Sequence, residues 1–72
     1  MKNRLIELGY APVRHELDVG AECVGVILPI SRHPGAVADL VDGLAAVPAD
    51  TGRYEMRPLG RDMLLYWPNI PY

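Results

Sequence analysis

The side chains that could do nucleophilic or metal chemistry are few: one cysteine, Cys23, and two histidines, His15 and His33. A cysteine nucleophile needs a neighbouring base, but Cys23 stands in an apolar segment, where a thiol normally serves as packing. The three residues also lack the close ligand spacings that mark zinc sites in a sequence. We therefore predict no catalytic residue, no metal site and no cofactor.

The sequence motifs of common enzyme classes do not occur either. The glycines fall singly, so they form neither a phosphate-binding loop nor a dinucleotide fingerprint. Asp39 and Asp42 are spaced to share one side of a helix, but on its polar side, without sign of a pocket. His15 has no partner motif and is explained as a half-buried histidine. We predict that the protein is not an enzyme.

Charged residues are unevenly distributed along the chain. The formal net charge is −2, whereas a domain that binds duplex DNA is usually clearly basic. The acidic residues of the segment 37–50 are Asp39, Asp42 and Asp50, and it contains no base. The bases Arg53, Arg57 and Arg61 follow. This distribution indicates either ordinary solvated surface or a surface for a charged partner.

The last third of the chain predicts a β-hairpin that would carry these arginines. With Gly60-Arg61 at the turn, Leu59 faces Asp62 and Tyr54 faces Trp67. This register sorts the side chains onto two faces, and a slip of one residue would destroy the sorting. The first face, expected to pack on a helix, contains Tyr54, Met56, Pro58, Met63, Leu65 and Trp67; the outer face contains Arg53, Glu55, Arg57, Leu64 and Tyr66.

Two further segments predict a second hairpin. Residues 13–18 alternate between apolar and polar types, which predicts a strand with His15 on its inward side. Residues 21–30 predict the partner strand, on which Gly25 lies opposite a buried face and indicates a bulge or a close neighbour. That buried face consists of Val24, Val26 and Leu28.

The segment from Pro34 to Val47 predicts the main helix. Its apolar residues Val37, Leu40, Val41 and Leu44 recur at helical spacing. His33 is expected as the N-cap, because a residue before proline avoids the α region and proline is favoured at the first helical position. Residues 2–8 predict a short helix, and residues 69–72 an extended tail.

These elements predict one α+β domain spanning residues 1–72. It would be a small two-layer domain, with an antiparallel sheet of about four strands built from two hairpins, one main helix packed on one face, and a short N-terminal helix. A chain of 72 residues has a thin core and little room for a deep pocket. The single cysteine excludes an internal disulfide, and the longest apolar run is too short for a membrane span. We expect a cytoplasmic protein.

Two binding functions remain after the enzymes are set aside. The outer hairpin face offers tyrosine, arginine and leucine, which suit a protein interface. The same face could instead bind nucleic acid, with Arg53, Arg57 and Arg61 contacting phosphates and Tyr66 stacking on a base.

In overall type, the chain resembles the very small, single-domain, mildly acidic inhibitors of phages and mobile elements, above all anti-CRISPR proteins. The resemblance rests on the compact α+β build and on the acidic helix, with Asp39 and Asp42, beside the basic strand, with Arg53 and Arg57. It implies a protein that blocks a bacterial CRISPR nuclease complex by occupying its DNA-binding surface, with acidic groups in place of phosphates. The acidic groups would be Asp39, Asp42, Asp50, Glu16, Asp18 and Glu22.

The leading hypothesis is therefore a non-enzymatic inhibitor in the cytoplasm of a bacterial host cell. We expect a monomer that binds a subunit of a CRISPR effector complex and contacts neither nucleic acid nor membrane. The alternative is a small nucleic-acid-binding or regulatory domain that uses the hairpin of Arg53, Arg57 and Arg61, with Leu64 and Tyr66 on the same face.

Overall fold

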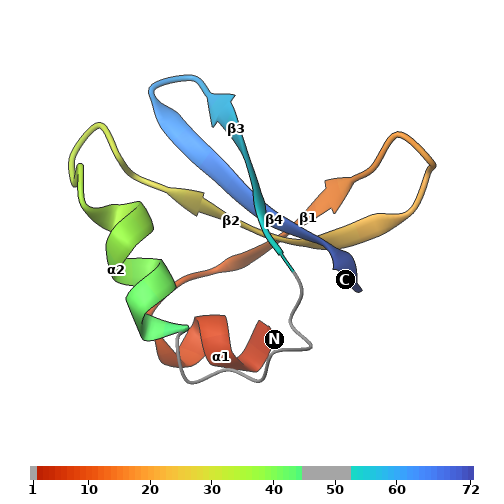
Figure 1. Cartoon of the computed structure of the whole chain (residues 1–72), viewed down its shortest axis with the longest axis horizontal. Helices are drawn as coiled ribbons and strands as arrows, with labels where there is room; N and C mark the ends of the chain where they lie inside the picture. Colours follow the sequence, from red (N-terminus) through yellow and green to blue (C-terminus); the bar gives the residue numbers. More distant parts are fainter. Residues whose placement is uncertain (1, 45–52) are drawn as a thin grey trace.

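The computed structural model describes residues 2–44 and 53–72 and confirms the predicted α+β class. The elements are α1 (Lys2–Glu7), β1 (Pro12–Glu16), β2 (Glu22–Leu28), α2 (Ala36–Gly43), β3 (Glu55–Leu59) and β4 (Asp62–Pro71). The strands form one antiparallel sheet in the order β1-β2-β4-β3 (Figure 1). Among the described residues, no helix is long and apolar enough to cross a membrane.

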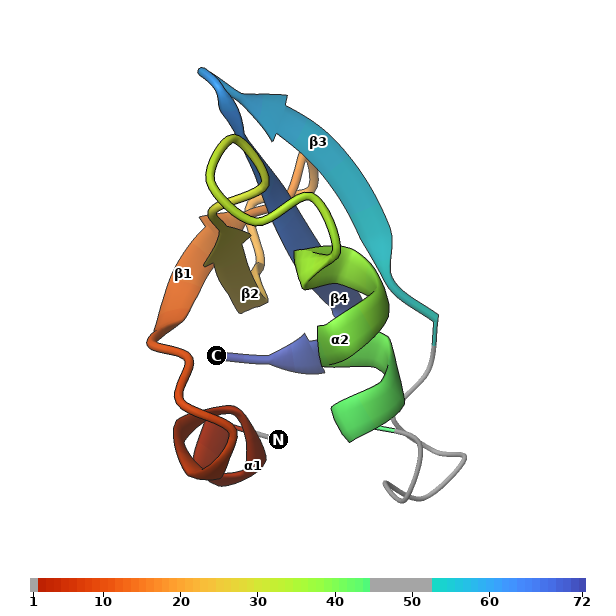
Figure 2. The same cartoon turned by 90° about the vertical axis from the view of Figure 1, so that its left-hand side faces the viewer.

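The core lies between the sheet and the two helices. Figure 2 shows α2 against one face of the sheet and α1 near the end where β1 begins. The central strands β2 and β4 supply most of the buried side chains, and each helix adds its own apolar residues. The buried cluster consists of Leu5, Val24, Val26, Leu28, Ala36, Leu40, Leu65 and Trp67.

The β3–β4 hairpin has the predicted register. Leu59 pairs with Asp62, and Met56 pairs with Leu65. Gly60 has a φ of 62°, and no described residue other than glycine has a positive φ, so the two-residue turn is of type II′. The ladder begins at Glu55, so the predicted pair of Tyr54 and Trp67 is not part of it.

The strand order places β3 at an edge of the sheet, and all five of its residues are exposed. Trp67 and Leu65 belong to the core as predicted, but Tyr54 and Met56 remain 40% and 49% exposed. A helix packs best on the middle of a sheet, and α2 accordingly contributes its buried residues to the cluster of β2 and β4. The expectation that Tyr54 and Met56 pack on the helix is therefore wrong.

The close neighbour predicted at Gly25 is present. A Cβ atom at this position would lie 3.3 Å from the Leu65 carbonyl oxygen and 3.4 Å from the Tyr66 Cβ. The register of β2 against β4 shifts between Cys23 and Val24, which is the irregularity of a β-bulge. Beyond this shift Cys23 pairs with Pro71, so most of the predicted tail is the end of β4.

The main helix is shorter than predicted at its beginning. It starts at Ala36, and its N-cap is Gly35 rather than His33. The Ala36 N–H donates to the His33 carbonyl at 2.9 Å, so residues 33–36 form a turn before the helix. The His33 side chain instead contacts Asp39, with 2.5 Å between Nε2 and Oδ2. Residues 45–47 of the predicted helix lie outside the described residues.

Polar contacts hold α1 against the rest of the fold. Arg4 donates from Nη2 to the Gly43 carbonyl at 2.9 Å, which joins α1 to the end of α2. Lys2 Nζ donates to the main-chain oxygen of Tyr72 at 2.7 Å and lies 4.2 Å from the centre of its ring. The Arg14 guanidinium lies 4.9 Å from the same ring. Tyr72 thus connects α1, β1 and the end of β4.

Candidate functional site

The sheet face that points away from α2, here called the open face, carries the candidate site. Residues paired across a ladder share a face, so Tyr66 lies there with its partners Gly25 and Glu55, and Leu64 lies there with Arg57. This confirms the predicted outer face of the hairpin for Glu55, Arg57, Leu64 and Tyr66, whereas Arg53 lies outside the ladder. His15 pairs with Cys23 and therefore also lies on the open face. His15 is half-buried, but it lies on the face away from the helix, so the expectation of an inward position is wrong.

Tyr66 is the centre of this face and is only 7% exposed. Its hydroxyl donates to Glu55 Oε2 at 2.8 Å, and its ring centre lies 4.2 Å from that of His15. Gly25 has no side chain, which leaves room for His15 from β1 to reach Tyr66 from β4. The hydrogen bond to Glu55 raises the pKa of Tyr66, and burial raises it further. The ring is thus mostly buried, and His15 packs against it.

A hollow of about 150 Å³ opens beside Tyr66. Pockets for small molecules and cofactors usually measure roughly 300–1,000 Å³, so this hollow suits a single side chain better than a cofactor. The charged residues that line it are Glu16, Asp18, Glu55 and Arg57, but Glu16 pairs with Glu22 in the β1–β2 ladder, so its side chain lies on the face opposite to that of His15. The lining residues are His15, Glu16, Leu17, Asp18, Glu55, Arg57, Tyr66 and Pro68.

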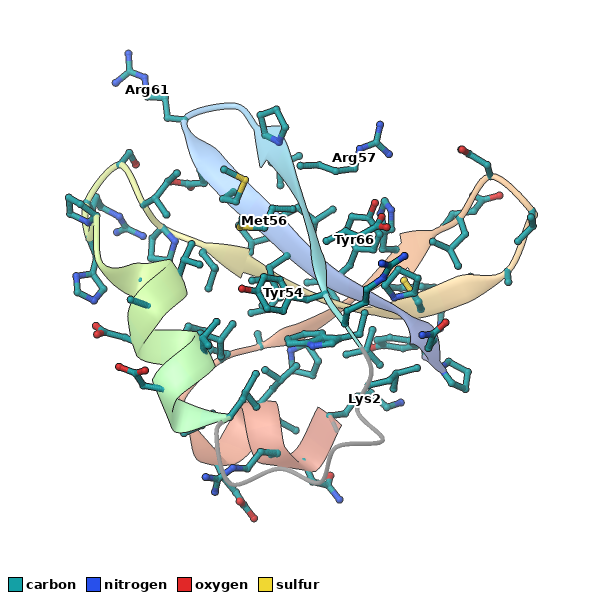
Figure 3. The ribbon with its side chains drawn as sticks, in the orientation of Figure 1. Lys2, Tyr54, Met56, Arg57, Arg61 and Tyr66 are labelled. Carbon is teal, nitrogen blue, oxygen red and sulfur yellow. The ribbon has the colours of Figure 1, made fainter. Side chains whose placement is uncertain are left out.

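The hollow joins residues that were expected on two alternative surfaces. Glu16 and Asp18 belong to the predicted acidic set, whereas Arg57 and Tyr66 belong to the predicted basic face. In the fold the β1–β2 hairpin and the β3–β4 hairpin contribute to one site (Figure 3). Asp18 and Glu55 outnumber the single arginine among the charged residues on this side of the sheet, so the hollow favours a cationic group.

The other predicted acidic residues lie elsewhere. Glu22 is paired with Arg14, with 2.6 Å between Oε2 and the guanidinium Nε, and Asp39 is paired with His33. Asp39 and Asp42 lie on α2, which Figure 1 shows on the opposite side of the molecule from the β1–β2 turn. Asp50 lies outside the described residues. The fold therefore divides the acidic set into separate groups.

The predicted arginine set does not form a continuous track. Arg53, Arg57 and Arg61 are exposed, and none forms a salt bridge with another described residue. Figure 3 shows Arg57 and Arg61 pointing in different directions from the hairpin. Leu64 belongs to β4, which lies between β2 and β3, and its side chain is half-buried on the open face.

Cys23 does not have the surroundings of a reactive thiol. Its side chain is fully buried, and burial raises the pKa of the thiol, with a further increase from the negative charge of Glu55. A raised pKa lowers the fraction of thiolate, which is the nucleophilic form. Within residues 2–44 and 53–72, no group of three His, Cys, Asp or Glu side chains could hold a metal ion.

Sequence reasoning missed the hollow itself. The signal for part of it was present, because the hairpin register places Glu55 opposite Tyr66. Leu17 shares the predicted strand face of His15, whereas Pro68, from the far half of β4, carried no such signal.

Comparisons with known proteins add no relative. No family model matches the chain, and no curated protein or solved structure is similar to it at a significant level.

Proposed function

We propose that this protein is a small, non-enzymatic inhibitor of the anti-CRISPR kind, which binds the basic DNA-binding surface of a bacterial CRISPR effector complex. The observation that supports this proposal is the hollow on the open face, where Asp18 and Glu55 line space for about one side chain and the Glu16 backbone belongs to its rim on β1. A protein that binds DNA presents lysine and arginine to the phosphates. One such side chain, inserted in the hollow, would meet carboxylates in place of phosphates.

Exposed apolar side chains at the β1–β2 tip and on the open face fit a protein partner. Val19, at the tip of the β1–β2 hairpin, is 85% exposed, and Ile27 on the open face is 44% exposed. Exposed apolar side chains beside polar groups suit a protein interface, which has an apolar core and a polar rim.

Nucleic-acid binding is less well supported by the geometry. The hypothesis relied on Tyr66 as a stacking platform, but that ring contacts His15 and its hydroxyl is bonded to Glu55. The arginines remain exposed and could contact phosphates without it. Direct binding of the protein to DNA or RNA would support this alternative.

The experiment measures binding to purified CRISPR effector complexes of several types, and competition with their target DNA. We expect the wild type to bind one of them and to displace DNA, with an association rate that falls as salt increases. The double variant Glu16→Lys with Asp18→Lys should lower the association rate at low salt by about tenfold or more. The matched control is Asp39→Lys with Asp42→Lys, which changes the net charge equally but on α2; it should have a much smaller effect.

Two results would overturn the proposal. The first is the absence of binding and of DNA displacement for every effector complex tested. The second is tight binding of the wild type itself to DNA or RNA in a mobility-shift titration, weakened by salt and lost when Arg53, Arg57 and Arg61 are replaced by alanine. That result would establish the nucleic-acid-binding alternative.

A further inference from the structure

The outer edge of β3 has backbone groups available for another strand. In a two-residue hairpin the pair that flanks the turn, here Leu59 and Asp62, exchanges hydrogen bonds, and the following pairs alternate. Glu55, Arg57 and Leu59 therefore direct their backbone groups toward β4. Met56 directs its N–H and carbonyl outward, and Pro58 directs only a carbonyl outward, which explains how proline is tolerated in this strand.

We propose that β3 pairs with β3 of a second copy of this chain, antiparallel and about a two-fold axis through Met56. In this arrangement the Met56 N–H of each copy donates to the Met56 carbonyl of the other. Tyr54 of each copy lies opposite Pro58 of the other, so the missing N–H of Pro58 removes one possible donor while its carbonyl remains an acceptor. The two sheets join into one, in the order β1-β2-β4-β3-β3-β4-β2-β1.

Charge selects this register over its neighbours. With the axis at Met56, Glu55 of each copy lies opposite Arg57 of the other, on the open face. Moving the axis by one residue places either Glu55 opposite Glu55 or Arg57 opposite Arg57, and like charges directly opposite each other are destabilising. Only the register centred on Met56 pairs both residues with an opposite charge.

The side chains are available for these contacts. Arg57 is exposed and forms no salt bridge with another residue in the described ranges. Glu55 is also exposed, and its Oε2 accepts the Tyr66 hydroxyl, while no described residue bonds its other carboxylate oxygen. The pair with Arg57 of the second copy would use that oxygen.

The pairing also covers exposed apolar surface. On the other face of β3, Met56 would contact Met56 of the second copy, and Tyr54 would contact Pro58. In the single chain Met56 is 49% exposed and Tyr54 is 40% exposed, and Figure 3 shows both on this hairpin. Exposed apolar side chains on an unpaired edge strand are a feature that proteins usually avoid, which favours an edge that is paired in solution.

The two-fold symmetry closes the assembly at a dimer, because the same edge is used by both copies. This proposal replaces the expectation of a monomer. It goes beyond the proposed inhibitory function, which does not require a second copy, although Glu55 and Arg57 also line the hollow.

The test measures molecular mass by sedimentation equilibrium over a range from micromolar to millimolar protein. We expect the mass to approach twice the 7.9 kDa of one chain as concentration rises. Arg57→Glu should raise the dissociation constant by about tenfold or more, because each pair becomes repulsive. Glu55→Lys combined with Arg57→Glu should restore dimerisation, because the exchanged charges are again complementary. Arg61→Glu, the same charge change at the turn, should have little effect.

A second measurement tests the register directly. In a Cys23→Ala background, Met56→Cys should form a covalent dimer under mild oxidation, because the two sulfur atoms would lie across the axis. Leu59→Cys, on the same strand but away from the axis, should cross-link far more slowly. A mass of one chain throughout the concentration range would overturn the proposal. So would a dimer that Arg57→Glu does not weaken, or one that cross-links at Leu59→Cys in preference to Met56→Cys.

Discussion

Tyr66 and Glu55 are direct partners in the β3–β4 ladder, and the Tyr66 hydroxyl donates a 2.8 Å hydrogen bond to the Glu55 carboxylate. This bond joins an exposed edge strand to the buried centre of the open face. It also places a carboxylate beside the hollow and holds the tyrosine in its protonated form. The contact is therefore relevant to both stability and binding.

The first prediction concerns alkaline pH. Cys23 and Tyr66 both have a pKa that folding raises above the ordinary values of 9.0 and 10.0, so the folded state holds these protons more tightly than the unfolded state. Their contribution to stability is complete below the ordinary pKa and is lost as pH rises through it toward the folded value. We expect the free energy of unfolding to fall above pH 9, and to fall less steeply in Cys23→Ala with Tyr66→Phe. Urea titrations at several pH values measure this; equal slopes in both proteins would contradict it.

The second prediction concerns Trp67, which is 2% exposed in the core. Trp67→Ala should lower the free energy of unfolding by about 3–5 kcal/mol, because it removes a large buried ring and leaves a cavity. Tyr54→Ala is the matched control from the exposed edge and should cost about 1 kcal/mol or less. Urea unfolding followed by circular dichroism provides both values. A loss below about 1 kcal/mol for Trp67→Ala would show that the ring is not in the core.

The third prediction concerns Gly25. Gly25→Ala should destabilise the fold by about 1–3 kcal/mol, because its Cβ would lie 3.3 Å from the Leu65 carbonyl oxygen, which the sheet holds in place. Gly35→Ala is the control, since the nearest atom to its Cβ would be His33 Cε1 at 3.7 Å. Thermal unfolding of the two variants should therefore differ clearly. Equal midpoints would mean that the sheet adjusts to a side chain at Gly25 without cost.

The fourth prediction concerns chemistry. If the protein has the proposed inhibitory function, Cys23→Ser and His15→Gln should each leave part of the inhibition in protein that remains folded, because Cys23 is buried and, among the described residues, neither has the partners of a nucleophile or a base. His15→Gln should weaken binding at the hollow to some extent, since His15 lines it. The measurement is inhibition of the effector complex after circular dichroism has shown folding. A folded Cys23→Ser variant that still binds its partner but no longer inhibits would indicate covalent chemistry.

Local patterns in the sequence were sufficient for the elements themselves. The β3–β4 register follows from Gly60 at the turn and from the period of two in the flanking strands, which is a property of the backbone alone. The buried face of β2 and the close approach at Gly25 follow in the same way. The start of α2 was less predictable. His33 and Pro34 are compatible with a helix N-terminus, but residues 33–36 form a turn and the helix begins at Ala36.

The strand order could not be obtained from such patterns, and it determines the surfaces. A hairpin sequence does not show which of its strands is central; the fold places β4 in the middle and β3 at the edge, so Trp67 is buried whereas Met56 on the same hairpin is exposed. The same order leaves Tyr66 near His15 across Gly25 and joins Glu16, Asp18 and Arg57 around one hollow. These are contacts between segments far apart in the chain, and only packing of the two hairpins into one sheet decides them.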